Sequence, residues 1–234
     1  MRMRQVNLKA GTPTNDNAAA GQVGEFISAS LAVGSATALV TATPKTIITA
    51  YLPPGDWDVN GVVDFLPAAT TSITVLAEGA SLVTNTLGAD DTYSSDSMTA
   101  TVPGAVAQRK NIPYQRFSIA ANTTTATITN ATPAVATYAG ADNFANGDAI
   151  VFSTTGALPS PLVAGTVYYI VSINTGANTF QISATSGGAA INTTTDGSGI
   201  HTFYAKKPTY LIGSATFTVS TMTAYGSIFA RRAR

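Results

Sequence analysis

Few residues of this 234-residue chain have side chains suited to catalysis. His201 is the only histidine, and it could combine with Asp196 and one of the many serines into a Ser-His-Asp triad. The Gly-x-Ser-x-Gly turn that presents the nucleophile in many such enzymes is absent from the sequence. One imidazole without a cysteine or a second histidine is also a poor zinc site. We therefore expect a structural or surface histidine and a protein that is not an enzyme.

Three aspartates, Asp56, Asp58 and Asp64, fall around the outward face of one expected strand. Paired carboxylates catalyse glycoside hydrolysis, but no second carboxylate cluster or aromatic platform follows nearby in the sequence. We expect a solvated acidic face at this place. Trp57 alternates with apolar neighbours, so we expect it to pack in the core rather than to stack on a sugar.

Two further stretches carry the oxygen ligands that a hard cation such as calcium prefers. They are the run Asp142, Asn143, Asn146, Gly147 and Asp148 and the loop with Asp90, Asp91 and Asp96. The spacing of an EF-hand and its terminal glutamate are absent. An Asn-Gly step between two strand patterns is typical of a hairpin turn with positive φ. We expect a turn in the first stretch, a solvated acidic loop in the second, and no metal or other cofactor.

Arginine is concentrated at the two ends of the chain, at Arg2, Arg4, Arg231, Arg232 and Arg234. The formal net charge is zero, with 12 basic and 12 acidic residues, which gives no basic body for nucleic-acid binding. Arginine forms two parallel hydrogen bonds with a carboxylate, so we expect these five side chains to anchor the protein to an acidic partner surface. The alternative is a tail that only improves solubility.

The composition predicts an all-β protein. Charged residues make up only 10% of the chain, against about 25% in ordinary soluble domains, and no stretch has the charged helical face of a bundle or coiled coil. Thr, Val and Ile are interrupted by 20 Gly and 11 Pro, which indicates many short strands joined by tight turns. We expect strands at residues 25–33, 38–43, 46–52, 57–65, 72–76, 82–87, 117–121, 149–153, 167–173, 179–184, 200–204, 210–212, 215–220 and 223–230.

The chemistry of the chain changes abruptly after Arg116. No Lys or Arg occurs from residue 117 to residue 205, which suggests a separately folded module inserted in a host domain. We expect an extended arm at 1–22, a host sandwich at 23–125 plus 208–234 that ends in a basic tail, and a small β-barrel or sandwich at 126–207. Removing the insert should then leave two strands joined as a hairpin.

Segments that would cross or target a membrane are not expected. The basic start of the chain lacks the apolar stretch of a secretory signal. The two long uncharged runs, 149–195 and 208–230, are diluted by Thr, Ser, Asn and Gly. We expect no membrane insertion.

Parts of both modules resemble structural proteins of tailed bacteriophages. In the host they are Gly21-Gln22-Val23-Gly24-Glu25, Pro54-Gly55-Asp56-Trp57-Asp58-Val59 and the stretch 215–226. In the insert they are Phe144-Ala145-Asn146-Gly147-Asp148, Val151-Phe152, Gly156-Ala157-Leu158-Pro159, Gly165-Thr166-Val167-Tyr168-Tyr169 and Asn178-Thr179-Phe180-Gln181-Ile182-Ser183, which are similar to a β module found in phage virion proteins. The Pro-Gly-x-aromatic-x-Val pattern is also similar to the trimeric jelly rolls of the C1q and tumour-necrosis-factor type.

The resemblance implies an antiparallel jelly-roll-like β-sandwich that carries a small inserted β-barrel or sandwich module and is located in the virion. It implies a head decoration, cement or short head-fibre subunit whose partners are further copies of itself and other virion proteins of the capsid, portal or tail. Low surface charge also suits a homotrimer with much of its surface buried. The alternative is a tail-associated fibre or adhesin that binds a glycan of the bacterial host.

Overall fold

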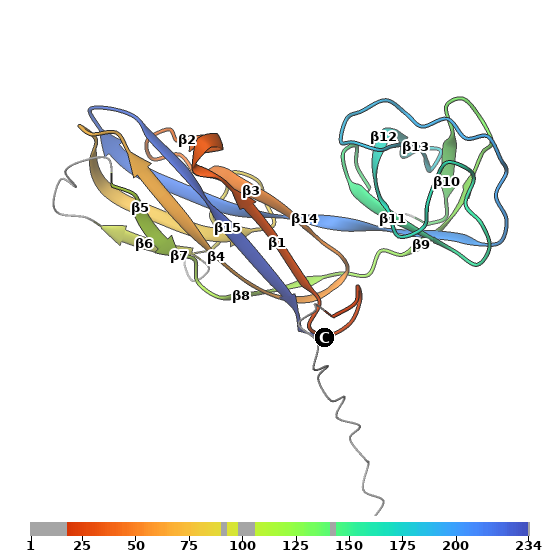
Figure 1. Ribbon diagram of the computed structural model, residues 1–234, viewed down its shortest axis with the longest axis horizontal. Coiled ribbons are helices and arrows are strands. Elements are labelled where there is room, and N and C mark those ends of the chain that lie inside the picture. The colour runs from red at the N-terminus through yellow and green to blue at the C-terminus, as the bar shows by residue number, and fades with distance from the viewer. Residues whose placement is uncertain (1–17, 90–92, 98–105, 141–143, 234) are drawn as a thin grey trace, which may run out of the picture.

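The computed structural model describes residues 18–89, 93–97, 106–140 and 144–233 (Figure 1). Almost all of its regular structure is antiparallel β-strand, and the only helical element in these ranges is the 3-10 turn η1 (Val33–Ser35). The prediction of an all-β fold is confirmed. The strands are β1 (Phe26–Leu31), β2 (Thr37–Ala38), β3 (Lys45–Leu52), β4 (Gly55–Pro67), β5 (Ser72–Ser81), β6 (Tyr93–Ser97), β7 (Gln108–Asn111), β8 (Gln115–Ile119), β9 (Thr124–Ile128), β10 (Val135–Tyr138), β11 (Ala149–Thr154), β12 (Val167–Asn174), β13 (Thr179–Ser183), β14 (His201–Thr218) and β15 (Met222–Arg232).

A sandwich of two sheets forms the larger lobe. One sheet has the order β1-β15-β4-β7, with β8 also paired to β4 and β2 to β15. The other contains β3, β14, β5 and β6. Their facing sides enclose one hydrophobic core, in which Trp57, Phe65 and Leu211 are fully buried.

The clearest sequence pattern is confirmed on β4. Trp57, Val59, Gly61, Val63 and Phe65 all face the core, as strict alternation requires. The Trp57 indole N–H donates to the Pro53 carbonyl at 2.8 Å, which satisfies its only polar group. At Gly61 the strands approach closely, because a Cβ there would lie 2.5 Å from the Ser227 carbonyl oxygen.

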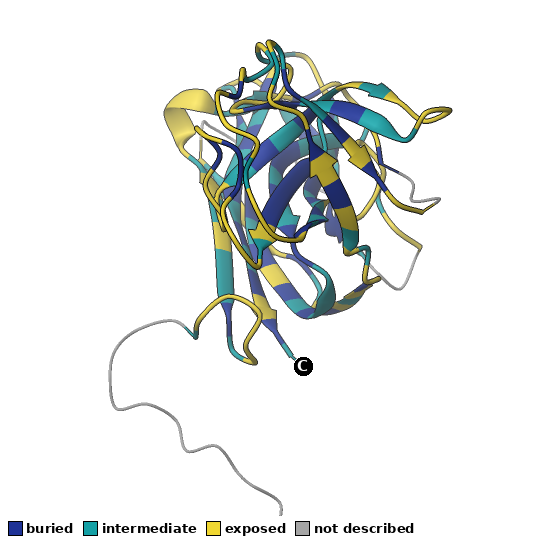
Figure 2. Cartoon of the chain, turned by 90° about the vertical axis from the view of Figure 1, so that its right-hand side faces the viewer, coloured by how far each residue is buried: buried dark blue, intermediate teal, exposed yellow. Residues whose placement is uncertain are grey.

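The second lobe is a closed antiparallel barrel. Its strands pair in the ring β14-β9-β10-β13-β12-β11 and back to β14. The inward side chains form a second core, separate from that of the sandwich, around Phe152, Phe180 and Phe203. When the molecule is viewed from the barrel side, buried and exposed residues follow one another along the strands (Figure 2).

One strand, β14, belongs to both lobes. Phe203 and Ala205 on one of its faces point into the barrel core, and Thr209 and Leu211 on the same face are buried in the sandwich. Lys207 is exposed where the strand crosses between the lobes. In Figure 1, β14 is the long ribbon that joins the two bodies.

Thr209 gives the first testable prediction. Its side chain is fully buried, and its hydroxyl has no hydrogen-bond partner within the part of the chain that the structure describes. Thr209→Val removes an unsatisfied polar group at constant shape, so we expect the free energy of unfolding to rise by about 1 kcal/mol in a urea titration. Thr71→Val is the matched control, because the Thr71 hydroxyl donates to the Thr221 carbonyl at 2.8 Å and its loss should destabilise the protein. Equal effects of the two changes would contradict this explanation.

Some expected elements are wrong. Residues 82–87 form no strand: 82–85 are bends and turns, and there the Asn85 carboxamide oxygen accepts a hydrogen bond from the Thr46 backbone N–H at 2.8 Å. Of the strand expected at 38–43 only its first residue belongs to a strand, β2, because the chain turns between Val40 and Thr43. The expected acidic loop with Asp96 contains β6, and β7 and the barrel strands β9 and β10 were not expected.

The hairpin expected on removal of the insert is also wrong. The flanking strand β8 pairs with β4 in one sheet, whereas the sandwich part of β14 pairs with β3 and β5 in the other. A junction between residues 125 and 208 would therefore cross from sheet to sheet. Sequence alternation shows which side of a strand is buried but does not identify the neighbouring strand.

Candidate functional site

The start of the described chain and its C-terminal strand lie side by side at one end of the sandwich. β1 pairs with β15 from Phe26 opposite Arg231 onward. Beyond that pair the Gly24 N–H donates to the Arg232 carbonyl, and the Arg232 N–H donates to the Glu25 carbonyl, both at 2.9 Å. Figure 1 shows the C-terminus at this end, beside the red segment that leads into β1. The described chain therefore begins beside the place where β15 ends.

Arg232 is held inside this end of the protein. Its Nε donates to Glu25 Oε2 at 2.8 Å and its Nη1 to the Pro54 carbonyl at 2.7 Å. The guanidinium carbon lies 4.5 Å from the centre of the Trp57 ring, a cation–π arrangement. Glu25 Oε2 also accepts a hydrogen bond from the Gly21 N–H at 2.8 Å. The cluster fastens the start of the chain to the last strand.

The expected anchoring role therefore needs correction for Arg232, whose side chain is not available to a partner. The alternation of β15 could have predicted this burial, since Ile228, Ala230 and Arg232 share the buried face. Arg231 lies on the opposite face and is exposed. The remaining three arginines of the prediction, Arg2, Arg4 and Arg234, lie outside the described residues.

Basic residues of the neighbouring strands balance the outward acidic face of β4. Asp64 is buried under Arg109, which donates through Nε and Nη2 at 2.8 and 3.0 Å. Asp58 accepts from Tyr114 and Arg116, and these hydrogen bonds hold the pKa of Asp58 below its usual value. The expected solvated acidic face is thus wrong for Asp64, because a partner distant in sequence covers it.

Asp56 completes this face and accepts a hydrogen bond from the Ser118 hydroxyl. Each of the three carboxylates thus has a donor from β7, β8 or the loop between them. Asp96 of the expected acidic loop forms an ion pair with Lys110, which links β6 to β7 across the two sheets. Asp90 and Asp91 lie outside the described residues.

The stretch before β11 is a turn whose side chains bind backbone groups of the turn itself and of β12. Gly147 has φ +90, Asp148 Oδ2 accepts from the Ala145 N–H, and Asn146 Oδ1 accepts from the Ile173 N–H, the last two at 2.9 Å. Burial raises the pKa of Asp148, while the hydrogen bond from Ala145 acts against this shift. The expected turn with positive φ at Gly147 is confirmed, but it does not form a hairpin, because β10 and β11 on its two sides pair with other strands. Asp142 and Asn143 lie outside the described residues. Residues 18–89, 93–97, 106–140 and 144–233 contain no group of three His, Asp or Glu side chains placed to hold a metal.

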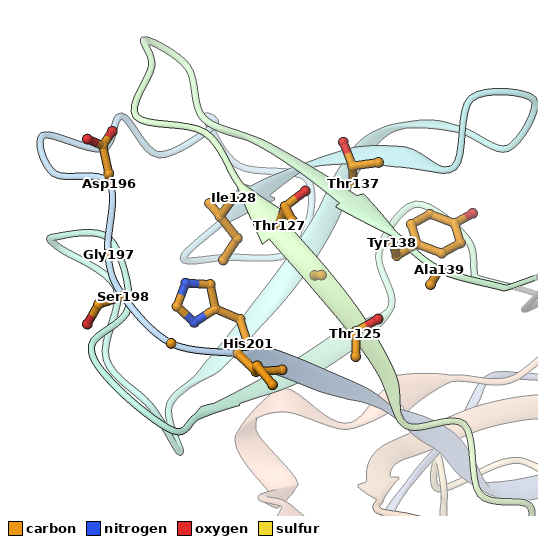
Figure 3. Close-up of a pocket in the computed structure, with 13 residues that line it drawn as sticks. Thr125, Thr127, Ile128, Thr137, Tyr138, Ala139, Asp196, Gly197, Ser198 and His201 are labelled. Atoms are coloured by element: carbon orange, nitrogen blue, oxygen red, sulfur yellow. The ribbon is translucent and has the colours of Figure 1, made fainter.

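A cavity of about 560 Å³ lies in the wall of the barrel beside β9 (Figure 3). It is open to solvent and is formed by β9, β10 and the segment 196–200 that leads into β14. Its lining is Thr125, Ala126, Thr127, Ile128, Thr137, Tyr138, Ala139, Asp196, Gly197, Ser198, Gly199, Ile200 and His201. The volume is within the range of about 300–1,000 Å³ that is usual for small-molecule sites.

His201 lies in this cavity wall without forming a triad. Its Nδ1 is 2.8 Å from the Thr154 hydroxyl, to which it is hydrogen-bonded. The nearby Ser198 hydroxyl accepts from the Ala157 N–H at 3.1 Å, and Asp196 is exposed. The side chain of His201 therefore has the partner of a structural histidine. The sequence analysis considered Asp196 and His201 only as members of a triad, and it missed the cavity and the threonines that line it with them.

No described helix has the length and apolarity to cross a membrane. Comparison of the chain with protein-family models, curated proteins and solved structures finds no match.

Proposed function

We propose that this protein is a non-enzymatic structural subunit of a tailed-phage virion, as a head decoration, cement or short head-fibre protein that self-associates as a trimer. The observation that supports the proposal is that the described start of the chain lies against the end of β15, at one end of the sandwich. An N-terminal arm with Arg2, Arg4 and Lys9 and the C-terminal Arg231 and Arg234 would then act from a single place. Such a basic end suits a partner surface that presents carboxylates.

The barrel lies next to this end rather than opposite to it. β14 leaves the sandwich at Lys207, which pairs with Leu52 of β3, and two residues further along the chain the Pro54 carbonyl accepts a hydrogen bond from Arg232. In the proposed assembly, barrel and chain ends face the particle together. The opposite end of the sandwich, with the loops at residues 68–71 and 219–221, then points outward.

Anchoring is tested by Arg231→Ala combined with Arg234→Ala, which leaves the buried Arg232 in place. We expect an unchanged melting temperature and weaker incorporation into particles, with a deficit relative to the native chain that shrinks at high salt, because salt screens exposed charges over about 8–10 Å and weakens the same contacts in the native chain. Lys45→Ala combined with Lys207→Ala removes the same charge elsewhere and serves as the control. Equal occupancy of the particle by both double variants across the salt range would contradict the anchoring role.

Self-association is tested by sedimentation of the purified full chain at micromolar concentration. We expect a trimer, because a chain with 10% charged residues leaves apolar surface that a monomer would have to expose. This part of the proposal would be contradicted if the protein were a stable monomer in solution and its copies also did not contact one another on the particle.

A further inference from the structure

The ring of barrel strands has a slit on one side. β14 pairs with β11 from Thr154 opposite His201 onward, but its ladder with β9 ends at the pair His201–Ala126. The segment before His201 turns away, with φ +77 at Gly199. The second half of β9 therefore has no strand on that side.

Backbone N–H and C=O groups of β9 point into this slit. The Thr129 N–H donates to the Val135 carbonyl, so the odd-numbered residues of β9 direct their backbone groups toward β10. The N–H and C=O of Ile128 consequently point to the other side, where the ladder with β14 has ended. One donor and one acceptor are thus presented at the base of the cavity.

Free polar side chains surround these backbone groups. Thr125, Thr127 and Thr137 are exposed, and their hydroxyls make no hydrogen bond within the described ranges. The Asp196 carboxylate, on the opposite wall, is likewise free among the described residues. Figure 3 shows the Ile128 side chain projecting from β9 toward the segment that carries Asp196 and Ser198. Hydroxyls both donate and accept, whereas a carboxylate only accepts, so the matching ligand must bring several donors.

The charges of the barrel restrict the ligand further. No Lys or Arg occurs from residue 117 to residue 205, and Asp196 is negative, so phosphates, sulfates and carboxylates find no counter-charge. The one aromatic residue of the lining, Tyr138, is only 4% exposed and cannot form a cage for an ammonium group. The aliphatic Ile128 and Ile200 offer apolar contact.

We propose that the cavity between β9 and residues 196–200 binds a neutral saccharide. The Asp196 carboxylate accepts from neighbouring hydroxyls of one sugar ring, the hydroxyls of Thr125, Thr127 and Thr137 exchange hydrogen bonds with the others, and Ile200 covers a C–H face. An extended peptide is the less favoured occupant, because the open edge of β9 offers the backbone groups of Ile128 alone. The site does not depend on the structural role proposed above, and it would give the adhesin alternative a defined place for its glycan.

The test uses the full chain and saturation-transfer difference NMR with glucose, galactose, mannose, N-acetylglucosamine and disaccharides of each as probes. The best of these sugars is then titrated calorimetrically. We expect Asp196→Asn to weaken its binding about tenfold, because a hydrogen bond to a charged group is lost, and Thr127→Val to weaken it about fivefold. Both side chains are exposed, so the melting temperature should not change.

Thr166→Val is the matched control, since Thr166 is an exposed barrel threonine outside the cavity. Absence of transfer to every sugar would overturn the proposal. Sugar binding that neither Asp196→Asn nor Thr127→Val weakens would show that the site lies elsewhere and would also overturn the proposal. Binding of an uncharged Thr-Val repeat peptide, lost in Thr127→Val, with no sugar bound, would assign the slit to strand addition instead. Location and copy number on particles test the structural role separately.

Discussion

Replacing Arg232 with alanine is expected to lower the free energy of unfolding by about 3–5 kcal/mol. The change would leave the Glu25 carboxylate buried without its counter-charge and the Pro54 carbonyl without a donor. It would also remove the guanidinium from the face of Trp57. Breaking one side of a buried ion pair costs more than the pair contributes, because the remaining charge has lost water as well as its partner. Urea denaturation of the purified chain measures the effect.

Arg231→Ala is the control, one residue away on the exposed face of the same strand, and should change the free energy of unfolding by less than about 0.5 kcal/mol. Arg232→Lys keeps the charge but cannot reach Glu25 and Pro54 with two separate donors in one plane, so an intermediate loss is expected. If Arg232→Ala and Arg231→Ala lowered the free energy of unfolding by the same small amount, the buried cluster would not hold the start of the chain to β15.

Replacing Glu78 with glutamine is expected to remove a pH dependence of stability. Glu78 lies on β5 between the core residues Leu76 and Ala80, is 1% exposed, and has one carboxylate oxygen without a hydrogen-bond partner in the described part of the chain. Burial raises the pKa of Glu78 from 4.5 to about 7, against a hydrogen bond with Ser94 that lowers it. The protonated acid is therefore the form that fits the folded protein.

The sign follows from proton linkage. Between pH 4.5 and pH 7 the folded protein holds a proton that the unfolded chain has lost, so stability is full below pH 4.5 and falls as the pH rises through 7. The loss amounts to about 3 kcal/mol, and Glu78→Gln should be more stable than the native chain by about this amount at pH 8 and nearly equal to it at pH 4. Urea titrations of both proteins between pH 4 and pH 8 measure this difference in stability. Asp196→Asn, at an exposed carboxylate, should leave the slope unchanged, and a parallel pH profile for Glu78→Gln would contradict the prediction.

Local alternation explains what could be predicted of the fold. The buried face of β4 and the positions of β11, β12 and β13 follow from periods of two between turn residues, and these patterns are visible in the sequence. β9 and β10 are short and rich in threonine and alanine, so their apolar contrast is weak. β14 is interrupted in the sequence by Lys206 and Lys207, whose side chains lie where the strand passes between the lobes.

The candidate sites depended on partners that the sequence does not identify. Asp64 is covered by Arg109, and Glu25 is paired with Arg232 across 207 positions of the chain. The cavity beside β9 arises because the pairing of β9 with β14 ends at Ala126 and His201. Where such a pairing ends is set by tertiary packing. Composition could indicate that the barrel has no cations, but only the pairing of strands shows where its free hydroxyls gather.

The shared strand β14 also limits how the gene of this protein can change. Because side chains alternate, inserting or deleting one residue between Ala205 and Thr209 would turn every later residue of the strand to the wrong side, and both cores could not be filled at once. A change of two residues keeps the alternation. At the other boundary, residues 120–123 form no strand and set no such condition. Exchange of the barrel for another by recombination should therefore tolerate odd as well as even differences in length at its first junction, provided that Asn122 keeps its hydrogen bonds to the Ala205 backbone. At the second junction it should tolerate only even differences.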